Sequence, residues 1–372
     1  MNNNLKAQKR PRVLISGGGT GGHIFPALSI ANEITRRYPK AEILFVGAEG
    51  RMEMERVPEA GYDIVGLPVA GFDRKHLANN FKVVYKLLRS MVKARAVLRR
   101  FKPDIVVGVG GYASGPVLKA AQRAGIPTML QEQNSYAGVT NKLLAKQANA
   151  ICVAYDNMDR FFPDETIIKT GNPVRAAITD CTLTQAEAKK KLGFDPDKPL
   201  IFVTGGSLGA RTINGSVNLA LPMWTRAGAQ VLWQTGKYYG EQYKPLGRRY
   251  EGVQVDNFIR DMASAYRAAD IIVSRAGAST ISEIQLLGAV AVLVPSPNVA
   301  ENHQTKNALA LANNGAAAMI ADSEARRELG PAVLDLLNDP ARRQSISQAA
   351  KEMALPNAAG KIVDALEQII GL

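Results

Sequence analysis

Short runs of β-branched and aliphatic residues alternate along the chain with longer stretches in which apolar residues recur every three or four positions. The short runs are typical of buried strands, and the longer stretches indicate amphipathic helices. The strands predicted in the first half are Val13–Ser16, Ile43–Val46, Ile64–Val65, Ile105–Val107, Thr128–Leu130 and Ala150–Val153. Those predicted in the second half are Leu200–Val203, Gln230–Trp233, Val253–Val255, Ile271–Val273 and Ala291–Val294.

This alternation predicts parallel sheets, because a strand reaches its parallel neighbour through a right-handed crossover that usually contains a helix. At 372 residues the chain is longer than one hydrophobic core usually organises. Turn residues at Gly171–Pro173 and a capping signal at Thr184–Glu187 indicate a domain boundary. We therefore predict an α/β protein with two doubly wound domains, residues 1–176 and 177–355. A last amphipathic helix within 356–372 is predicted to pack back toward the first domain.

Each half carries a glycine-rich turn after its first predicted strand, Gly17–His23 and Gly205–Gly209. Glycine has no Cβ, so backbone amides and a helix N-terminus can close on phosphate oxygens in such turns. The pair predicts two nucleotide-type domains that face each other across a cleft. The first turn also matches the dinucleotide fingerprint, so a nicotinamide-dependent oxidoreductase is an alternative. That alternative leaves the second turn and Glu283 without a function.

His23 follows the first turn at the start of a predicted helix and is one of only three histidines. With an ordinary pKa of about 6.5, it could accept a proton from a sugar hydroxyl, although a structural role is the other interpretation. Two further segments follow strands at the same sheet edge, the glycine-rich turn Gly110–Pro116 and the polar run Gln131–Asn134. We expect both to contact a ligand.

In the second half, the small residues of Ser274–Thr280 open the way for an anion at a helix N-terminus. Glu283, one turn into that helix, could accept hydrogen bonds from a ribose diol. Its simpler role would be to stabilise the helix dipole. The segment Glu301–Asn307 adds amides that could bind sugar hydroxyls.

The formal net charge is +13, and residues up to Asn172 hold 25 of the 46 basic residues but only 14 of the 33 acidic ones. The segment from Arg74 to Lys102 contains ten Lys or Arg and no acid. Helical geometry places five of these cations on one face, Lys82, Lys86, Arg89, Lys93 and Arg100. The opposite face carries Leu77, Phe81, Val84, Leu88 and Met91, which we predict to be core. We predict that the basic face binds anionic phospholipid; nucleic acid is the rival ligand, but the segment lacks interleaved aromatics.

Cys152 and Cys181 are too few for a disulfide framework or a zinc cluster, which favours a reducing cytoplasm. The apolar stretch Leu286–Val294 is shorter than the roughly 20 residues that span a bilayer. Any membrane contact is therefore expected to be peripheral.

These motifs closely resemble, nearly end to end, those of the MurG family of peptidoglycan N-acetylglucosaminyltransferases. The resemblance rests on Gly18–His23, Gly110–Tyr112, Glu132–Asn134, Gly171–Arg175, Gly205–Ser207, Arg275-x-Gly277-Ala278 with Glu283, and Gln304. It implies the GT-B fold and an inverting transfer of N-acetylglucosamine from UDP-N-acetylglucosamine to the C4 hydroxyl of undecaprenyl-diphospho-N-acetylmuramyl pentapeptide. It also implies a peripheral protein on the cytoplasmic face of the bacterial inner membrane.

The resemblance further implies a set of donor contacts, with no cofactor and no metal. The set is Thr20, Gly21, Gly22, Asn134, Arg175, Ser207, Ile259, Ala278, Ser279, Thr280, Ile281, Ser282, Glu283 and Gln304. Gln131 and His303 stay outside it. We predict His23 as the base that removes the acceptor proton, with Glu132 as the alternative. Two other readings remain, a sugar-nucleotide or nucleic-acid binding protein without catalysis, and a transferase of the same fold with another acceptor.

Overall fold

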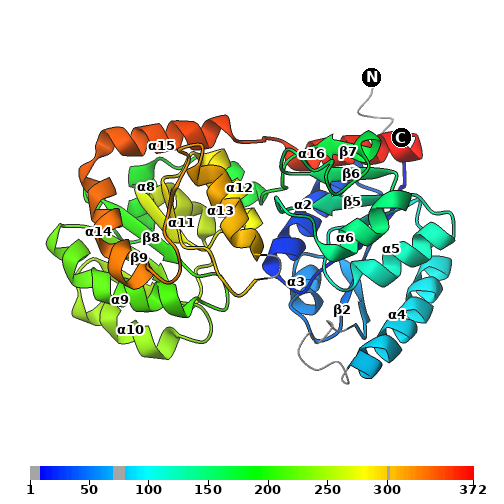
Figure 1. The fold of residues 1–372 in the computed structure, drawn as a ribbon, viewed down its shortest axis with the longest axis horizontal. Coiled ribbons are helices and arrows are strands. Elements are labelled where there is room, and N and C mark those ends of the chain that lie inside the picture. Colours follow the sequence, from blue (N-terminus) through cyan, green and yellow to red (C-terminus); the bar gives the residue numbers. More distant parts are fainter. Residues whose placement is uncertain (1–8, 70–79, 300–301) are drawn as a thin grey trace. The chain divides into compact units, whose positions relative to one another are not determined.

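The computed structural model describes residues 9–69, 80–299 and 302–372, and the chain divides into two compact units (Figure 1). The N-terminal unit consists of Met1–Val174 and Pro356–Leu372, and the C-terminal unit is Arg175–Leu355. The boundary predicted after residue 176 is thus two residues too late. Arg175 lies in the C-terminal unit, where its side chain pairs with Glu283.

The N-terminal unit is built on a seven-stranded parallel sheet of order β3-β2-β1-β4-β5-β6-β7. The six predicted strands are present, and β7 is an additional edge strand. The bounds are β1 Arg12–Ser16, β2 Glu42–Ala48, β3 Asp63–Leu67, β4 Ile105–Gly108, β5 Thr128–Glu132, β6 Ala150–Val153 and β7 Ile167–Lys169. The strand order reverses between β1 and β4, and ligands of open α/β sheets bind beyond the carboxyl ends of strands at such a point.

Helices cover both faces of this sheet, because alternate residues of each strand point in opposite directions (Figure 1). Val13 and Ile15 join the core beneath α2 and α16, whereas Leu14 joins the core beneath α4 and α5. The helices are α2 Gly21–Arg37, α3 Glu53–Glu59, α4 Asn80–Phe101, α5 Ser114–Arg123, α6 Val139–Leu144 and α16 Ala358–Ile370, with short 3₁₀ turns at Ala145–Gln147 and Asp164–Thr166.

The last helix, α16, is part of the N-terminal unit although it follows the C-terminal unit in sequence. Its buried residues Ile362, Val363 and Leu366 lie in the same core as α2. Arg37 of α2 donates hydrogen bonds to Asp364 (2.5 Å) and Glu367 (3.0 Å). Apolar packing and this partly buried ion-pair cluster together hold α16 on α2.

The C-terminal unit repeats the design with a six-stranded parallel sheet of order β10-β9-β8-β11-β12-β13. The five predicted strands are present, and the short edge strand β13 is additional. The strands are β8 Leu200–Thr204, β9 Gln230–Gln234, β10 Val253–Asp256, β11 Ile271–Ser274, β12 Ala291–Leu293 and β13 Ala318–Met319. The helices are α7 Ala176–Thr179, α8 Gln185–Lys191, α9 Arg211–Arg226, α10 Gly240–Arg249, α11 Met262–Ala268, α12 Ala278–Leu287, α13 His303–Ala312, α14 Ala325–Asn338 and α15 Pro340–Glu352.

The predicted capping signal is confirmed at the start of α8, where Thr184 and Glu187 form a reciprocal capping box. The two faces of the sheet again differ by strand alternation. Ile201 and Val203 pack in one core with the fully buried Trp224 of α9. Phe202 faces the other way and makes an edge-to-face contact with Tyr266 of α11, their ring centroids 5.6 Å apart.

The predicted core face of α4 is wrong at Leu88, which is 61% exposed. The helix buries the row Val83, Ser90, Ala94 and Leu98 instead. Small residues at 90 and 94 allow α4 to approach α5 closely, and Leu88 is then turned to the surface. Leu77 and the side chains of Phe81 and Val84 lie outside the described residues, and Met91 is half-buried.

Candidate functional site

The first glycine turn joins β1 to α2 at the carboxyl edge of the N-terminal sheet. Gly18 and Gly19 have φ values of +146° and +88°, which favour glycine. A Cβ at Gly111, in the turn after β4, would lie 2.4 Å from the carbonyl oxygen of Gly18. The two glycine turns therefore pack directly against each other at the point where the strand order reverses.

His23, in the first turn of α2, is fixed against both glycine turns. Its Nδ1 atom lies 3.1 Å from the carbonyl oxygen of Gly18 and 3.3 Å from Oγ1 of Thr20. In a neutral ring, a contact with a carbonyl oxygen requires the proton on Nδ1, so Nε2 carries the lone pair. A Cβ at Gly110 would lie 3.0 Å from Nε2. The structure thus brings His23 and both turns together, as the sequence predicts for this edge.

Glu132, at the end of β5, is 2% exposed, and both of its oxygens accept hydrogen bonds. One oxygen accepts from the backbone N–H (3.1 Å) and side-chain amide (3.2 Å) of Asn134. The other accepts from the N–H of Gly138 and the side-chain amide of Asn141, each at 2.9 Å. Four donors surround the carboxylate, and it holds the loop from residue 133 to 138 in shape.

A buried amide cluster supports the same edge, and sequence reasoning did not identify it as a unit. Gln131 donates to Oδ1 of Asn172 (2.9 Å), and Asn172 donates to the backbone carbonyl of Gln133 (3.0 Å). Gln133 in turn donates to the carbonyl of Val109 (2.8 Å), next to the second glycine turn. All three amide side chains are at most 3% exposed, so they serve as internal braces.

In the C-terminal unit, the glycine turn after β8 has positive φ values at Gly206 (+84°) and Gly209 (+89°). Ser207, one of the predicted donor contacts, lies in this turn and not at a helix N-terminus, because α9 begins only at Arg211. Gln234 connects this turn to another predicted site residue. Its amide donates to the carbonyl of Gly206 (3.3 Å) and its oxygen accepts from the N–H of Ile259 (2.9 Å).

The segment predicted to bind an anion starts α12. The helix begins at Ala278 after an extended Gly277, with no side-chain cap and no acid in its first turn. Ser279 Oγ is buried without a hydrogen-bond partner in the described part of the chain. Ile281 is fully buried core, and the Ser282 hydroxyl donates back to the carbonyl of Ala278 (3.1 Å). The uncapped N–H groups and the positive end of the dipole suit an anionic group here.

Glu283 is only 5% exposed and is held from two sides. Arg175 donates to its Oε1 through Nε (3.1 Å) and Nη2 (2.7 Å). Tyr266 donates its hydroxyl to Oε2 (2.7 Å), and burial followed by the charge of Glu283 raises the pKa of that hydroxyl well above its usual value. Sequence reasoning missed Tyr266, since an internal tyrosine of α11 looks like ordinary core.

Two other predicted segments brace the loops of this edge. Gln304, near the start of α13, accepts a hydrogen bond from the N–H of Ser296 (2.9 Å). Arg275 donates to the carbonyl of Val294 (2.9 Å) and pairs with Asp322, so it clasps the loops after β11, β12 and β13. Residue 301 lies outside the described residues.

In the described part of α4, the exposed surface carries apolar side chains as well as basic ones. Tyr85, Lys86, Leu88, Arg89, Val92 and Lys93 are exposed; we call these six residues the α4 surface. Lys93 pairs with Glu49 (3.0 Å), and the side chain of Lys82 lies outside the described residues. On α6, Val139 (50% exposed) and Leu143 (76% exposed) flank Lys142. Within the described part of the chain, no helix is long and apolar enough to cross a membrane.

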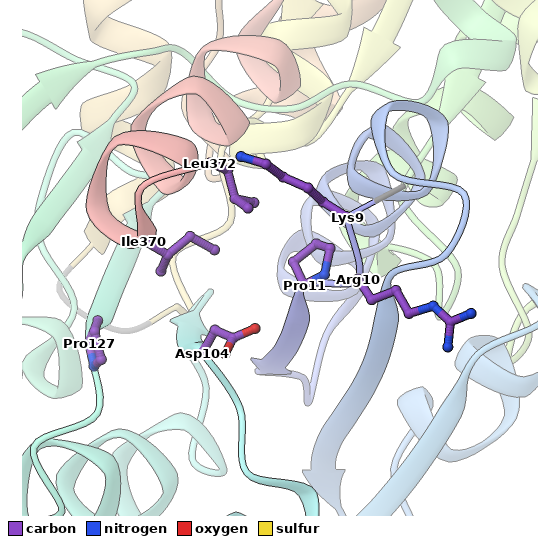
Figure 2. A pocket seen from close by; sticks show the side chains of 7 residues that line it. All are labelled: Lys9, Arg10, Pro11, Asp104, Pro127, Ile370 and Leu372. Atoms are coloured by element: carbon purple, nitrogen blue, oxygen red, sulfur yellow. The ribbon is translucent and has the colours of Figure 1, made fainter. Parts of the chain in front are cut away.

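A pocket of about 460 Å³ lies at the other edge of the N-terminal sheet (Figure 2). Its lining includes Arg10, just before β1, Asp104, just before β4, and Pro127, just before β5. These residues precede the strands, whereas the glycine turns and His23 follow them. The pocket is therefore separate from the candidate site.

Two parallel-sheet units, each with a glycine-rich turn after its first strand, match the GT-B fold. The family models "Glycosyltransferase family 28 N-terminal domain" and "Glycosyltransferase family 28 C-terminal domain" match residues 13–153 and 200–362. The chain belongs to glycosyltransferase family 28, within its MurG group.

Relatives match over nearly the whole chain. One from Parabacteroides distasonis is 55% identical over 364 residues, covering 97% of this chain and 99% of the relative. One from Porphyromonas gingivalis W83 is 54% identical over 371 residues, covering 99% and 98%. Both are named UDP-N-acetylglucosamine–N-acetylmuramyl-(pentapeptide) pyrophosphoryl-undecaprenol N-acetylglucosamine transferase.

Solved structures agree with this placement. The crystal structure of Acinetobacter baumannii MurG has a TM-score of 0.74 at 30% identity and covers 96% of this chain and 99% of its own. The calicheamicin glycosyltransferase CalG4, at 16% identity with a TM-score of 0.72 and coverage of 98% and 99%, shares the fold. The resemblance inferred from the motifs is confirmed, and the matches favour a transferase over a nicotinamide enzyme.

Proposed function

We propose that this hexosyltransferase moves N-acetylglucosamine from UDP-N-acetylglucosamine to the C4 hydroxyl of undecaprenyl-diphospho-N-acetylmuramyl pentapeptide. The product is the lipid-linked disaccharide precursor of peptidoglycan. The observation that carries the proposal is the identity of about 55% with transferases of this name over nearly their full length. In support of the proposal, His23 lies at the carboxyl edge of the N-terminal sheet and Glu283 follows the carboxyl edge of the C-terminal sheet, where this family of reactions would need a base and a donor contact.

The donor is assigned mainly to the C-terminal unit. The uncapped N-terminus of α12 and the Arg175 guanidinium are both positive, so they would stabilise the negative charge that develops on the departing UDP. The Glu283 carboxylate would accept hydrogen bonds from the ribose diol, with Ser207, Ile259 and Gln304 as further donor contacts. In the N-terminal unit, Thr20, Gly21, Gly22 and Asn134 are assigned to the donor as well.

The reaction is a single displacement at C1 of the sugar, which inverts the anomeric centre and turns an α-linked donor into a β-linked product. The C4 hydroxyl of the acceptor forms the new bond, the bond to UDP breaks, and UDP leaves with the electron pair.

In this proposal, cationic and dipolar groups of the protein stabilise the charge of the departing UDP, as a bound metal ion would in other enzymes. Turnover should therefore be unchanged within about twofold after treatment with excess EDTA; a loss that Mg²⁺ restores would contradict this part.

His23 is proposed as the base that receives the proton of the C4 hydroxyl on Nε2. Its contact with the Gly18 carbonyl fixes the proton on Nδ1, which leaves the lone pair on Nε2. Glu132 is assigned to the loop instead, because its four donors already bind the charged form. His23→Ala should lower kcat about 10²- to 10⁴-fold while donor affinity stays within about twofold. Turnover near the wild-type rate would contradict the assignment.

The α4 surface, together with exposed Val139 and Leu143 of α6, is proposed to dock on anionic phospholipid at the cytoplasmic face of the membrane. Its cations attract such a surface by about 1 kcal/mol each, and exposed Leu88 and Leu143 can enter the headgroup region. Reversing Lys86, Arg89 and Lys93 to Glu should weaken binding to phosphatidylglycerol vesicles at least about a hundredfold, yet spare turnover of a short-tailed acceptor.

The matched control for the vesicle experiment is the same charge change at Lys244, Arg248 and Arg249, which are exposed on α10. The control should bind vesicles within about threefold of wild type. Equal loss in both triple variants would show that net charge alone, rather than the α4 surface, governs binding.

The transfer reaction itself is tested by incubating the protein with UDP-N-acetylglucosamine and a short-chain lipid-linked muramyl pentapeptide. The expected product is a β-1,4-linked disaccharide on the lipid, identified by mass spectrometry and NMR, together with one UDP released per linkage. UDP-glucose and UDP-N-acetylgalactosamine serve as donor controls. Donor binding without any UDP release would favour the non-catalytic alternative.

A further inference from the structure

Glu53 carries a buried carboxylate and is not among the predicted site residues. It opens α3 and is 1% exposed, although carboxylates are rarely buried so completely. Its Oε2 atom accepts a hydrogen bond from the N–H of Gly19, and its Oε1 atom accepts one from the N–H of Ala48, both at 2.9 Å. A single side chain thus joins the turn after β1 to the end of β2.

The first glycine turn is wrapped closely around this carboxylate. A Cβ at Gly18 would lie 2.2 Å from Oε1 of Glu53, and a Cβ at Gly47 would lie 2.5 Å from its Cγ. In the described part of the chain, Glu53 accepts hydrogen bonds from two backbone N–H groups, and no Lys or Arg there pairs with it. A buried negative charge of this kind depends on those donors being held in place.

The Gly18–Gly19 peptide connects Glu53 to His23. The N–H of this peptide donates to Glu53, and its carbonyl oxygen lies 3.1 Å from Nδ1 of His23. A peptide group is planar, so fixing the N–H also fixes the direction of the carbonyl. Hydrogen bonds in a chain polarise one another, and the carboxylate therefore strengthens the carbonyl as an acceptor.

We propose that Glu53 is a positioning residue for His23 and acts through the Gly18–Gly19 peptide. The carboxylate holds the peptide so that its carbonyl receives the Nδ1 proton, and Nε2 then presents its lone pair to the substrate. This inference rests on the proposed function, in which His23 is the base. Its geometrical part concerns the ring of His23 in the free protein and can be tested without turnover.

The first test is ¹H–¹⁵N correlation NMR of the imidazole groups, which distinguishes the two neutral tautomers. With only three histidines, the His23 signals can be assigned from the His23→Ala spectrum. Wild type should hold His23 as the Nδ1–H tautomer at pH 8. An Nε2–H tautomer in the wild-type protein would overturn the proposal, whatever any variant does.

The second test is Glu53→Gln, which keeps the shape but turns one acceptor oxygen into an amide that faces a backbone N–H. We expect a mixture of His23 tautomers and a fall in kcat of about ten- to a hundredfold, with the dissociation constant for UDP-N-acetylglucosamine within about twofold of wild type. Glu55→Gln is the matched control, because Glu55 is exposed on the same helix and loses the same charge. It should behave as wild type in every measurement.

A Glu53→Gln protein with the wild-type tautomer and wild-type kcat would refute the proposal. A merely structural role would lower the melting temperature without changing the tautomer of the folded fraction, and this also counts against it. If His23→Ala were fully active, the base assignment would fail, yet the tautomer measurement would still decide whether Glu53 orients the ring.

Discussion

Replacing Glu132 by Gln distinguishes the role of base, which the sequence left as an alternative for this residue, from the loop-holding role that its hydrogen bonds indicate. The carboxylate accepts four hydrogen bonds, from backbone and side-chain donors of Asn134, Gly138 and Asn141. Gln has nearly the same shape but only one acceptor oxygen. In the less damaging orientation, that oxygen keeps the two 2.9 Å bonds, and the new NH₂ group faces the two donors of Asn134.

The cost follows from the bonds that are lost. A hydrogen bond to a charged acceptor contributes about 1.5–3 kcal/mol, and the two lost bonds are the longer ones, at 3.1 and 3.2 Å. Taking the lower value for each bond, Glu132→Gln should lower the free energy of unfolding of the N-terminal unit by about 3 kcal/mol. For a unit of this size, that corresponds to a melting temperature lower by about 6–12 °C.

The assay is thermal unfolding followed by circular dichroism, with hydrogen exchange of residues 133–144 to localise the effect. Glu165→Gln, at an exposed carboxylate, is the control and should change stability by no more than about 0.5 kcal/mol. A Glu132→Gln protein that melts like wild type but loses about a thousandfold in kcat would refute this reasoning and make Glu132 the base.

Three further predictions follow from buried or paired groups. Tyr266→Phe removes one hydrogen bond that orients the donor-site carboxylate, so KM for UDP-N-acetylglucosamine should rise about three- to tenfold with little change in kcat; an unchanged KM would contradict this. Burial raises the pKa of the Cys152 thiol to about 12, whereas Cys181 is partly exposed. Ellman's reagent should therefore modify one thiol in the native protein and two in guanidinium. Rapid reaction of both thiols in the native protein would contradict the burial of Cys152. The hydrogen bond from Arg36 lowers the pKa of Glu33 below 4.5 in the folded protein. The contribution of Glu33 to stability is therefore present above about pH 4.5 and is lost as pH falls through the lower folded pKa. Glu33→Gln should flatten this part of the curve of unfolding free energy against pH, and an unchanged slope would contradict the prediction.

Most strands of both sheets could be predicted from the sequence, because the central strands are continuous apolar runs buried on both faces. The two additional strands, Ile167–Lys169 and Ala318–Met319, are short edge strands that pair on one side only. Such strands have no long apolar run to reveal them. Their existence depends on the neighbouring strand, which a local pattern does not report.

The exposure of Leu88 was predicted wrongly for a related reason. A helical wheel identifies the apolar face of α4. The face that packs against α5, however, is the one where small residues such as Ser90 and Ala94 let the two helices come close. The start of α9 at Arg211 could not be read from the sequence, because a glycine turn resembles a helix start until its backbone angles are known.

Candidate site residues could be proposed from the sequence where chemistry and local pattern coincide, as at His23 and in the segment that starts α12. Tyr266 and Glu53 were missed because their partners are distant in sequence. Tyr266 lies 17 residues from Glu283, and Glu53 lies 34 residues from Gly19. Only the folded chain shows that each of them supports a group that the motifs do reveal.

Calorimetric titration of UDP-N-acetylglucosamine separates donor binding, which is assigned to Glu283, from the chemical step, which is assigned to His23. Glu283→Gln should weaken donor binding about tenfold or more, because a charged acceptor is lost. His23→Ala should bind the donor within about twofold of wild type and yet fail to turn it over. Wild-type affinity in Glu283→Gln, or an equal loss in His23→Ala, would contradict these two assignments.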